Sequence, residues 1–162
     1  MNLDAILRAL VLLAVANSAP VLATRFLGAF AAQPLDFNRT MPDGKPIFGP
    51  SKTLRGLIAA LAATTLVAPA LGVDALWGAA IAAGSMAGDL LSSFLKRRWR
   101  LPASSKATGL DQIPEALFGA VAAQNPLSLN LLDIAATVLA FFLGQIVLSR
   151  LSWRVGLRKE PY

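Results

Sequence analysis

The chain has 162 residues, of which 56% are apolar and only 15% are charged, and this balance indicates a membrane protein. Lysine and arginine outnumber the acids by 15 to 9. They gather between apolar runs, so lipid headgroups and phosphorylated substrates are the expected partners and nucleic acid is not. The chain has neither cysteine nor histidine, which excludes disulfides, thiol nucleophiles and imidazole bases. A bound metal would therefore be a hard ion held by oxygen atoms, magnesium or manganese.

Residues 1–32 predict a first membrane-spanning helix, with no charged side chain between Ala9 and Thr24. Its apolar core is interrupted at residues 17–20, where Pro20 leaves a backbone carbonyl without its helical partner. This segment is either a kink that faces the protein interior or a proline kink without a direct role. A cleaved signal peptide is the weaker interpretation, because Asp4 stands in the n-region and the apolar core is interrupted.

Residues 33–53 form a polar loop rich in proline, glycine, asparagine and aspartate, which favour turns. Ser51 is expected to cap a second helix. Lys52 and Arg55 stand three residues apart near the start of that helix, so we expect their side chains to point the same way. No charge follows from Gly56 to Val73, a length that nearly crosses a hydrocarbon core of about 30 Å.

A third helix is predicted from about Ala75 to Arg97, and it carries an acid, Asp89, inside an apolar run. An acid within a bilayer is costly, so Asp89 requires a functional reason. The polar residues around it stand at helical spacing and share one face of the helix. They are Ser85, Asp89, Ser92, Ser93 and Lys96.

Gly84 and Gly88, on the same helix, have the GxxxG spacing that permits close contact between helices. The spacing is a weak motif, because small residues are common in apolar helices. It would suit a homodimer, a tight contact within the chain, or clearance for a ligand beside Asp89.

A second basic loop runs from Lys96 to Gly109, and Asp111 is expected to cap a fourth helix from Gln112 to about Gln124. Glu115 lies one turn further along this helix. The uncharged part is short for a span, so we expect the helix to be tilted or sheltered by its neighbours.

A break at residues 125–126 precedes a fifth helix, from about Leu127 to Leu151. The chain is therefore predicted to be one all-α domain, residues 1–162, a polytopic membrane protein with about five transmembrane helices. With five spans, all the basic segments fall on one side, which the positive-inside rule makes cytoplasmic, and the N-terminus lies outside. The basic residues are Arg39, Lys45, Lys52 and Arg55 in the first loop, Lys96, Arg97, Arg98, Arg100 and Lys106 in the second, and Arg150, Arg154, Arg158 and Lys159 in the tail.

The two basic loops and the adjoining helix ends bring acids and cations to one surface. Such a set suits a metal-bound polyphosphate, because carboxylates hold the ion while cations and helix N-termini hold phosphate oxygens. Three alternatives stay open: Asp111 as only an N-cap, Asp89 in a structural ion pair with Arg55 or Lys96, and basic loops that only set topology, above all at Arg98 and Arg100. The candidate groups are Lys52, Thr53 and Arg55, then Asp89, Ser92, Ser93, Lys96 and Arg97, and finally Asp111, Gln112 and Glu115.

Three blocks in the same order and spacing resemble the CDP-archaeol synthase family, a compact branch of the membrane cytidylyltransferases that include phosphatidate cytidylyltransferase. These blocks are residues 49–56 (GPSKTLRG), 88–98 (GDLLSSFLKRR) and 109–112 (GLDQ). Residues 17–20 and Asp43-Gly44 fit the same pattern. The His- and Gly-rich stretch of the phosphatidate enzymes is replaced here by residues 103–109, which favours the archaeol-type branch and leaves the lipid tail open.

The resemblance implies an integral membrane enzyme that converts CTP and a lipid phosphomonoester into a CDP-lipid and pyrophosphate. It implies that Asp89 and Asp111 bind magnesium and that Lys52, Arg55, Lys96 and Arg97 hold phosphates. A phosphotransferase that consumes CDP-lipids is disfavoured, because the acids here stand singly. The alternative of another class is a non-catalytic small membrane transporter or scaffold, whose polar groups would line a path across the bilayer. The sequence assigns no role to Asn17 or Glu115.

Overall fold

The structure is a computed structural model that describes residues 1–102, 105 and 107–154, so Lys106, Arg158 and Lys159 lie outside the described residues. The described chain is helical, with only two isolated backbone bridges in the first loop, and the predicted all-α class is confirmed. The elements are α1 (Leu3–Leu27), α2 (Leu54–Val67), the 3-10 helix η1 (Ala68–Leu71), α3 (Ala75–Arg98), α4 (Gln112–Ala122), α5 (Gln124–Leu127) and α6 (Leu131–Arg154).

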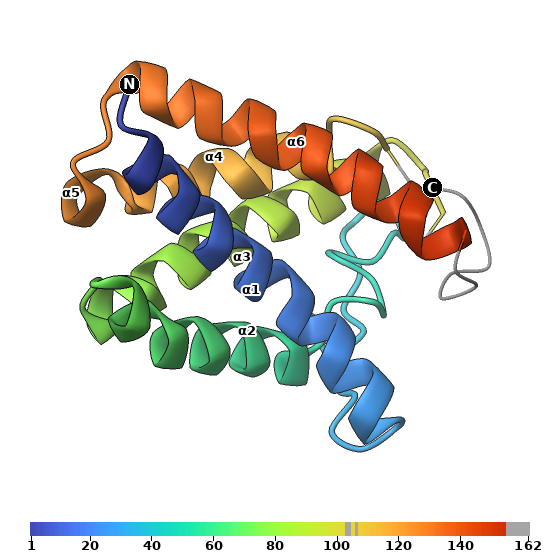
Figure 1. Cartoon of the computed structure of the whole chain (residues 1–162). Coiled ribbons are helices and arrows are strands. Elements are labelled where there is room, and N and C mark those ends of the chain that lie inside the picture. The colour runs from blue at the N-terminus through green and yellow to red at the C-terminus, as the bar shows by residue number, and fades with distance from the viewer. Residues whose placement is uncertain (103–104, 106, 155–162) are drawn as a thin grey trace.

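Four helical stretches are long and apolar enough to cross a membrane: α1, α2 together with η1, α3, and α6. The predicted fourth helix, α4, has only 11 residues and does not reach the length of a span. The polytopic membrane class is therefore confirmed, with four long helices and a short one that packs along α3 (Figure 1).

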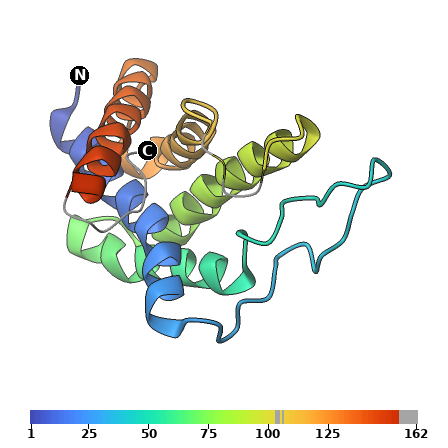
Figure 2. The same ribbon diagram turned by 90° about the vertical axis from the view of Figure 1, so that its right-hand side faces the viewer.

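The helical bundle has two opposite ends, which differ in the segments that they carry. Figure 1 shows the N-terminus, η1 and α5 at one end, and both basic loops at the other. At the first of these ends, polar contacts connect the start of α1 to η1 and to α6. Arg8 Nη1 donates to the Leu71 carbonyl at 3.3 Å, and the Asn2 amide donates to Asp133 at 2.9 Å. Figure 2 shows the loop between α1 and α2 leaving the helices as a long arm at the opposite end. The predicted gathering of the basic loops at one end is therefore seen in the fold.

The chain after α3 folds back into the bundle before α4 begins. Ser92 Oγ donates to the Leu110 carbonyl at 2.6 Å, so residue 110 lies level with Ser92, well before the end of α3. This return explains how α4 can be short and still carry the chain towards the opposite end. Apolar length alone does not reveal such a return.

The Gly84–Gly88 spacing serves the contact between α3 and α4. A methyl group on Gly88 would overlap the carbonyl of Pro114, and one on Gly84 would meet the carbonyl of Phe118 at 2.7 Å. Of the three interpretations of this spacing, the tight contact within the chain is the one that the structure shows, and the homodimer stays a prediction.

Two helix starts differ from prediction because of local capping. The N-cap of α2 is Thr53 and not Ser51, since Thr53 Oγ1 accepts the Gly56 amide at 3.1 Å. The last helix starts at Leu131, because Asn130 and Asp133 accept each other's backbone amides at 2.9 and 3.2 Å and fix the start there.

Candidate active site

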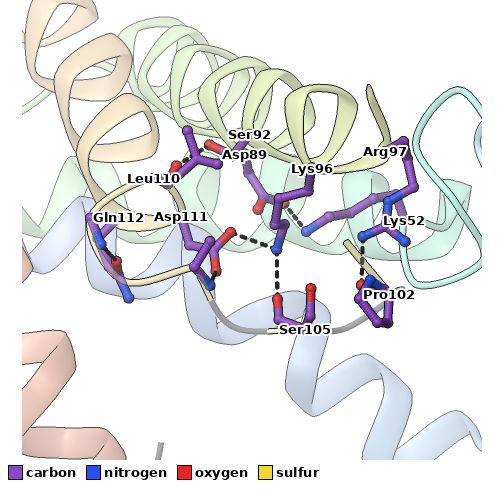
Figure 3. A network of polar contacts seen from close by, with 12 residues as sticks. Lys52, Asp89, Ser92, Lys96, Arg97, Pro102, Ser105, Leu110, Asp111 and Gln112 are labelled. Atoms are coloured by element: carbon purple, nitrogen blue, oxygen red, sulfur yellow. Dashed lines mark hydrogen bonds and ion pairs between the residues drawn. The ribbon is translucent and has the colours of Figure 1, made fainter. Parts of the chain in front are cut away.

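Two lysine–carboxylate ion pairs lie at the basic end of the bundle. Lys52 Nζ lies 2.5 Å from Asp89 Oδ2, and Lys96 Nζ lies 2.6 Å from Asp111 Oδ1. Lys52 comes from the arm before α2, Asp89 and Lys96 from α3, and Asp111 from the start of α4, and Figure 3 shows both pairs along one side of α3. The predicted shared face of Asp89 and Lys96 therefore carries a cluster of alternating charge.

Lys52 and Arg55 point to different partners, so the prediction that they point the same way is wrong. Because α2 begins only at Leu54, helical spacing does not relate Lys52 to Arg55. Arg55 instead binds the carboxyl end of α1 and the turn after it, where its Nη1 donates to the carbonyls of Gly28 at 2.9 Å and Phe30 at 2.5 Å. In this structure Arg55 fastens α1 to α2 and does not face the ion pairs.

The second basic loop is wrapped around the Lys96–Asp111 pair. Lys96 also donates to the Ser105 carbonyl at 3.0 Å, and Asp111 Oδ2 accepts the Ala107 amide at 3.0 Å. Asp111 stands at the N-cap position of α4 but its side chain accepts no helix amide there. The interpretation of Asp111 as only an N-cap is therefore wrong, and the neighbouring Gln112 shapes the loop by accepting the Gly109 amide at 2.8 Å.

The remaining candidate groups for binding phosphate differ in how far their side chains are already engaged. Ser92 and Ser93 are buried, and the hydroxyl of Ser92 is engaged by the Leu110 carbonyl. Arg97 is also buried and donates through Nη2 to the Pro102 carbonyl at 2.7 Å, while its Nε has no hydrogen-bond partner among the described residues. The Arg97 guanidinium therefore retains a donor that could bind an anion. Thr53, by contrast, is used as the cap of α2.

Glu115 and Asn17 form a polar contact that sequence reasoning left unassigned. Asn17 Nδ2 donates to Glu115 Oε1 at 2.5 Å, and Ser85 Oγ donates to the same oxygen at 3.4 Å. Glu115 is only 3% exposed. The side chain of Asn17 therefore points to the protein interior, while the neighbouring Ser18 is exposed, and a direct role for the proline kink stays a prediction. The signal available in the sequence is an acid on an apolar helix one turn after Asp111.

A small cavity adjoins the Lys52–Asp89 pair, and a separate groove runs along α1. The cavity has a volume of about 60 Å³, and apolar side chains such as Leu57 and Met86 form most of its wall. The groove, of about 650 Å³, runs between α1 and α6, and Asn17 lines it. The groove therefore reaches the Asn17–Glu115 contact.

The donor set fits a hard cation that arrives with a phosphate ligand. Within residues 1–102, 105 and 107–154, no group of three or more acidic side chains is arranged to hold a metal alone. Asp89 and Asp111 are both carboxylates neutralised by lysine, and Mg²⁺ is usually bound by one or two carboxylates together with substrate phosphates. Asp89 and Asp111 are therefore the residues that would hold magnesium arriving with a polyphosphate.

The fold and the site define an integral membrane protein with a cluster of acids and lysines at one end of a helical bundle. Comparison with known proteins gives the family. The chain is 33% identical to the CDP-archaeol synthase of Aeropyrum pernix, over 99% of this chain and 95% of that protein, and 33% identical to that of Pyrobaculum calidifontis, over 91% of each. The chain belongs to the CDP-archaeol synthase family, and the resemblance seen in its motifs is confirmed.

Other comparisons agree in part. The CDP-archaeol synthase of Pyrococcus furiosus is 40% identical, but the match spans only 60% of each chain. A solved structure described as an intramembrane enzyme for archaeal membrane lipid biosynthesis superposes with a TM-score of 0.73 and 28% identity, over 86% of this chain and 89% of that one. No family model matches the chain.

Proposed function

We propose that this protein is a CTP-dependent cytidylyltransferase that converts a membrane lipid phosphate into its CDP-lipid. A phosphate oxygen of the lipid bonds to the α-phosphorus of CTP, the bond from that phosphorus to the bridging oxygen breaks, and pyrophosphate leaves. The observation that carries this proposal is the pair of lysine–carboxylate ion pairs at one end of a membrane-embedded bundle. Such a reaction depends on positioning and charge neutralisation, so a chain without histidine can perform it.

The ion pairs can exchange partners when the substrates bind. Lys52 and Lys96 would move from carboxylate to phosphate oxygens, and Arg97 would donate through Nε, which has no partner among the described residues, so each charge would stay paired. Asp89 and Asp111 would then hold magnesium. When bound, the metal supplies neutralisation of the negative charge on the phosphates.

The two ion pairs have different surroundings, which supports the binding of a different substrate at each pair. Lys52 lies beside a small cavity with mostly apolar walls, so it could hold the phosphate of a lipid whose adjoining apolar atoms contact those walls. Lys96 and Arg97 donate to carbonyls of the polar second loop, which suits the triphosphate of CTP. The groove between α1 and α6 suits the lipid chains. The name of the relatives favours isoprenoid ether chains over acyl ester chains.

The test is a reaction with purified protein in detergent, magnesium and radiolabelled CTP. With an archaeol-type ether lipid phosphate we expect label in an organic-soluble product and one pyrophosphate per product. A parallel reaction with phosphatidate tests which lipid chains the protein accepts. Chelation of the divalent metal should stop the reaction. Folded protein that makes no product from either lipid would favour the transporter or scaffold alternative, and release of CMP from added CDP-lipid would favour a phosphotransferase.

We further propose that the active site lies on the cytoplasmic face and the N-terminus outside, because both basic loops gather at one end. The chain lacks cysteine, so single cysteines report topology without background. Arg100→Cys should react with a membrane-impermeant maleimide only in inverted vesicles, and Asp74→Cys, in the turn before α3, only in right-side-out vesicles. The reverse pattern would place the active site outside.

A further inference from the structure

The arm, residues 33–53, is an ordered structure although it contains no helix. At its base the outgoing and the returning segment of the arm lie side by side, because the Leu35 amide donates to the Lys52 carbonyl at 2.7 Å. At its tip, the Met41 amide donates to the Lys45 carbonyl at 2.9 Å and closes a turn. Lys52 therefore stands on the returning segment, where the arm and not a helix sets its backbone.

Asp36 holds the middle of the arm together. Its carboxylate accepts the amides of Asn38 at 3.0 Å and of Phe48 and Gly49 at 2.9 Å each. Burial raises the pKa of this carboxyl, but the amides of Gly49, Phe48 and Asn38 outweigh that effect and leave the pKa below its usual value of 3.8. The sequence showed Asp36 only as a turn-forming residue.

Arg98 clamps the tip of the arm to α3. Its Nη1 lies 2.7 Å from Asp43 Oδ2, and its Nη2 donates to the carbonyls of Pro46 at 2.6 Å and Lys45 at 3.3 Å. The guanidinium carbon also lies 5.2 Å from the centre of the Phe94 ring. A planar fork with several fixed donors can make these contacts together, which a lysine ammonium cannot.

We propose that Arg98 is a positioning residue that aligns Lys52 with Asp89. Arg98 and Asp89 belong to the same helix, so clamping the arm to Arg98 makes α3 the common support of both members of the Lys52–Asp89 pair. Arg98 faces the arm and contacts none of the four members of the ion pairs. The interpretation of Arg98 as only a topology anchor is thereby replaced, and the catalytic part of this inference rests on the proposed function.

The first test measures the geometry and needs no activity. In a Lys52→Cys, Asp89→Cys protein, a short bifunctional thiol reagent should join the two positions, and adding Arg98→Ala should slow this crosslinking about tenfold. Arg98→Ala should also speed tryptic cleavage after Arg39, an exposed residue of the arm whose carbonyl accepts the Ile47 amide at 3.2 Å, by a similar factor. Arg100→Ala, an exposed arginine at the same helix end, is the matched control and should change neither rate. Unchanged crosslinking and cleavage in Arg98→Ala would overturn the proposal.

The second test separates positioning from a general loss of structure. Arg98→Ala should lower kcat/KM about tenfold in the wild-type background and have no further effect in a Lys52→Ala background, because the two changes remove the same contribution. Asp43→Ala, which keeps the carbonyl contacts of Arg98, should show a smaller loss. An equal effect of Arg98→Ala in both backgrounds would show that Arg98 acts independently of Lys52. If the wild type itself made no product, the proposed function would fail, while crosslinking and proteolysis would still decide the role of the clamp.

Discussion

Replacing Asp89 by Asn should lower the rate of CDP-lipid formation by about 100-fold or more, because the negative charge that would hold magnesium beside the phosphates is lost. The amide keeps the size of the side chain but cannot neutralise a cation. It also leaves Lys52 without its carboxylate partner. Lys52 would then bind the substrate phosphate as strongly before the reaction as during it. We therefore expect the loss mainly in kcat, and it should be measured as initial rates with saturating CTP and lipid.

The matched control is Asp74→Asn, which changes an exposed acid at the other end of the same helix. Asp74 Oδ1 only caps α3 by accepting the Leu76 amide at 2.8 Å, and asparagine caps helices equally well, so activity should stay within about twofold. Asp89→Glu keeps the charge on a longer side chain, so its activity should lie between those of Asp89→Asn and Asp74→Asn. If Asp89→Asn kept full activity, the assignment of Asp89 as a metal ligand would have to be abandoned.

The residues placed correctly from the sequence are those whose neighbours follow from helical spacing. Asp89 and Lys96 stand seven residues apart on one helix, so their shared face was predictable before any tertiary contact was known. Lys52 and Arg55 were misplaced because the arm ends at the N-cap Thr53, so Lys52 lies before the helix and Arg55 inside it. Helical spacing applies only inside a helix, and the capping choice between Ser51 and Thr53 was not decided by residue type.

The contacts that could not be predicted join residues far apart in the chain. Asn17 and Glu115 are separated by 98 positions, and Arg98 lies 52 positions from the Pro46 carbonyl to which it donates. The local sequence around each of these residues does not indicate which distant residue it contacts. Glu115 and Arg98 also show that a charge near a membrane surface can serve packing between segments, which composition rules for topology do not consider.

The short helix α4 gives the clearest case of tertiary structure overriding a length rule. Its 11 residues are too few for a span, yet the loop before it returns to the level of Ser92. That return places Asp111 beside Lys96 instead of at the loop tip. The position of Asp111 therefore depends on how closely α4 can lie against α3.

Replacing Gly88 by Ala should lower the free energy of unfolding by about 1–3 kcal/mol, the usual cost of overpacking a tight contact. The added methyl would overlap the Pro114 carbonyl, which is backbone and cannot rotate away, so α4 must shift. The shift would move Asp111 relative to Lys96, so activity should fall together with stability. Unfolding in mixed detergent micelles, followed by circular dichroism, measures the first effect and initial rates measure the second.

Gly144→Ala is the control, because Gly144 lies in α6 and a methyl group there would meet nothing within 4 Å. It should leave stability unchanged or slightly increased, since alanine favours helix over glycine by up to about 1 kcal/mol. This control compares stability alone, because Gly144 lines the groove proposed for the lipid chains. Equal stability of the Gly88 and Gly144 variants would mean that α4 is not held against α3 by the close approach at Gly88. The site would then need another explanation for how a helix of 11 residues keeps Asp111 beside Lys96.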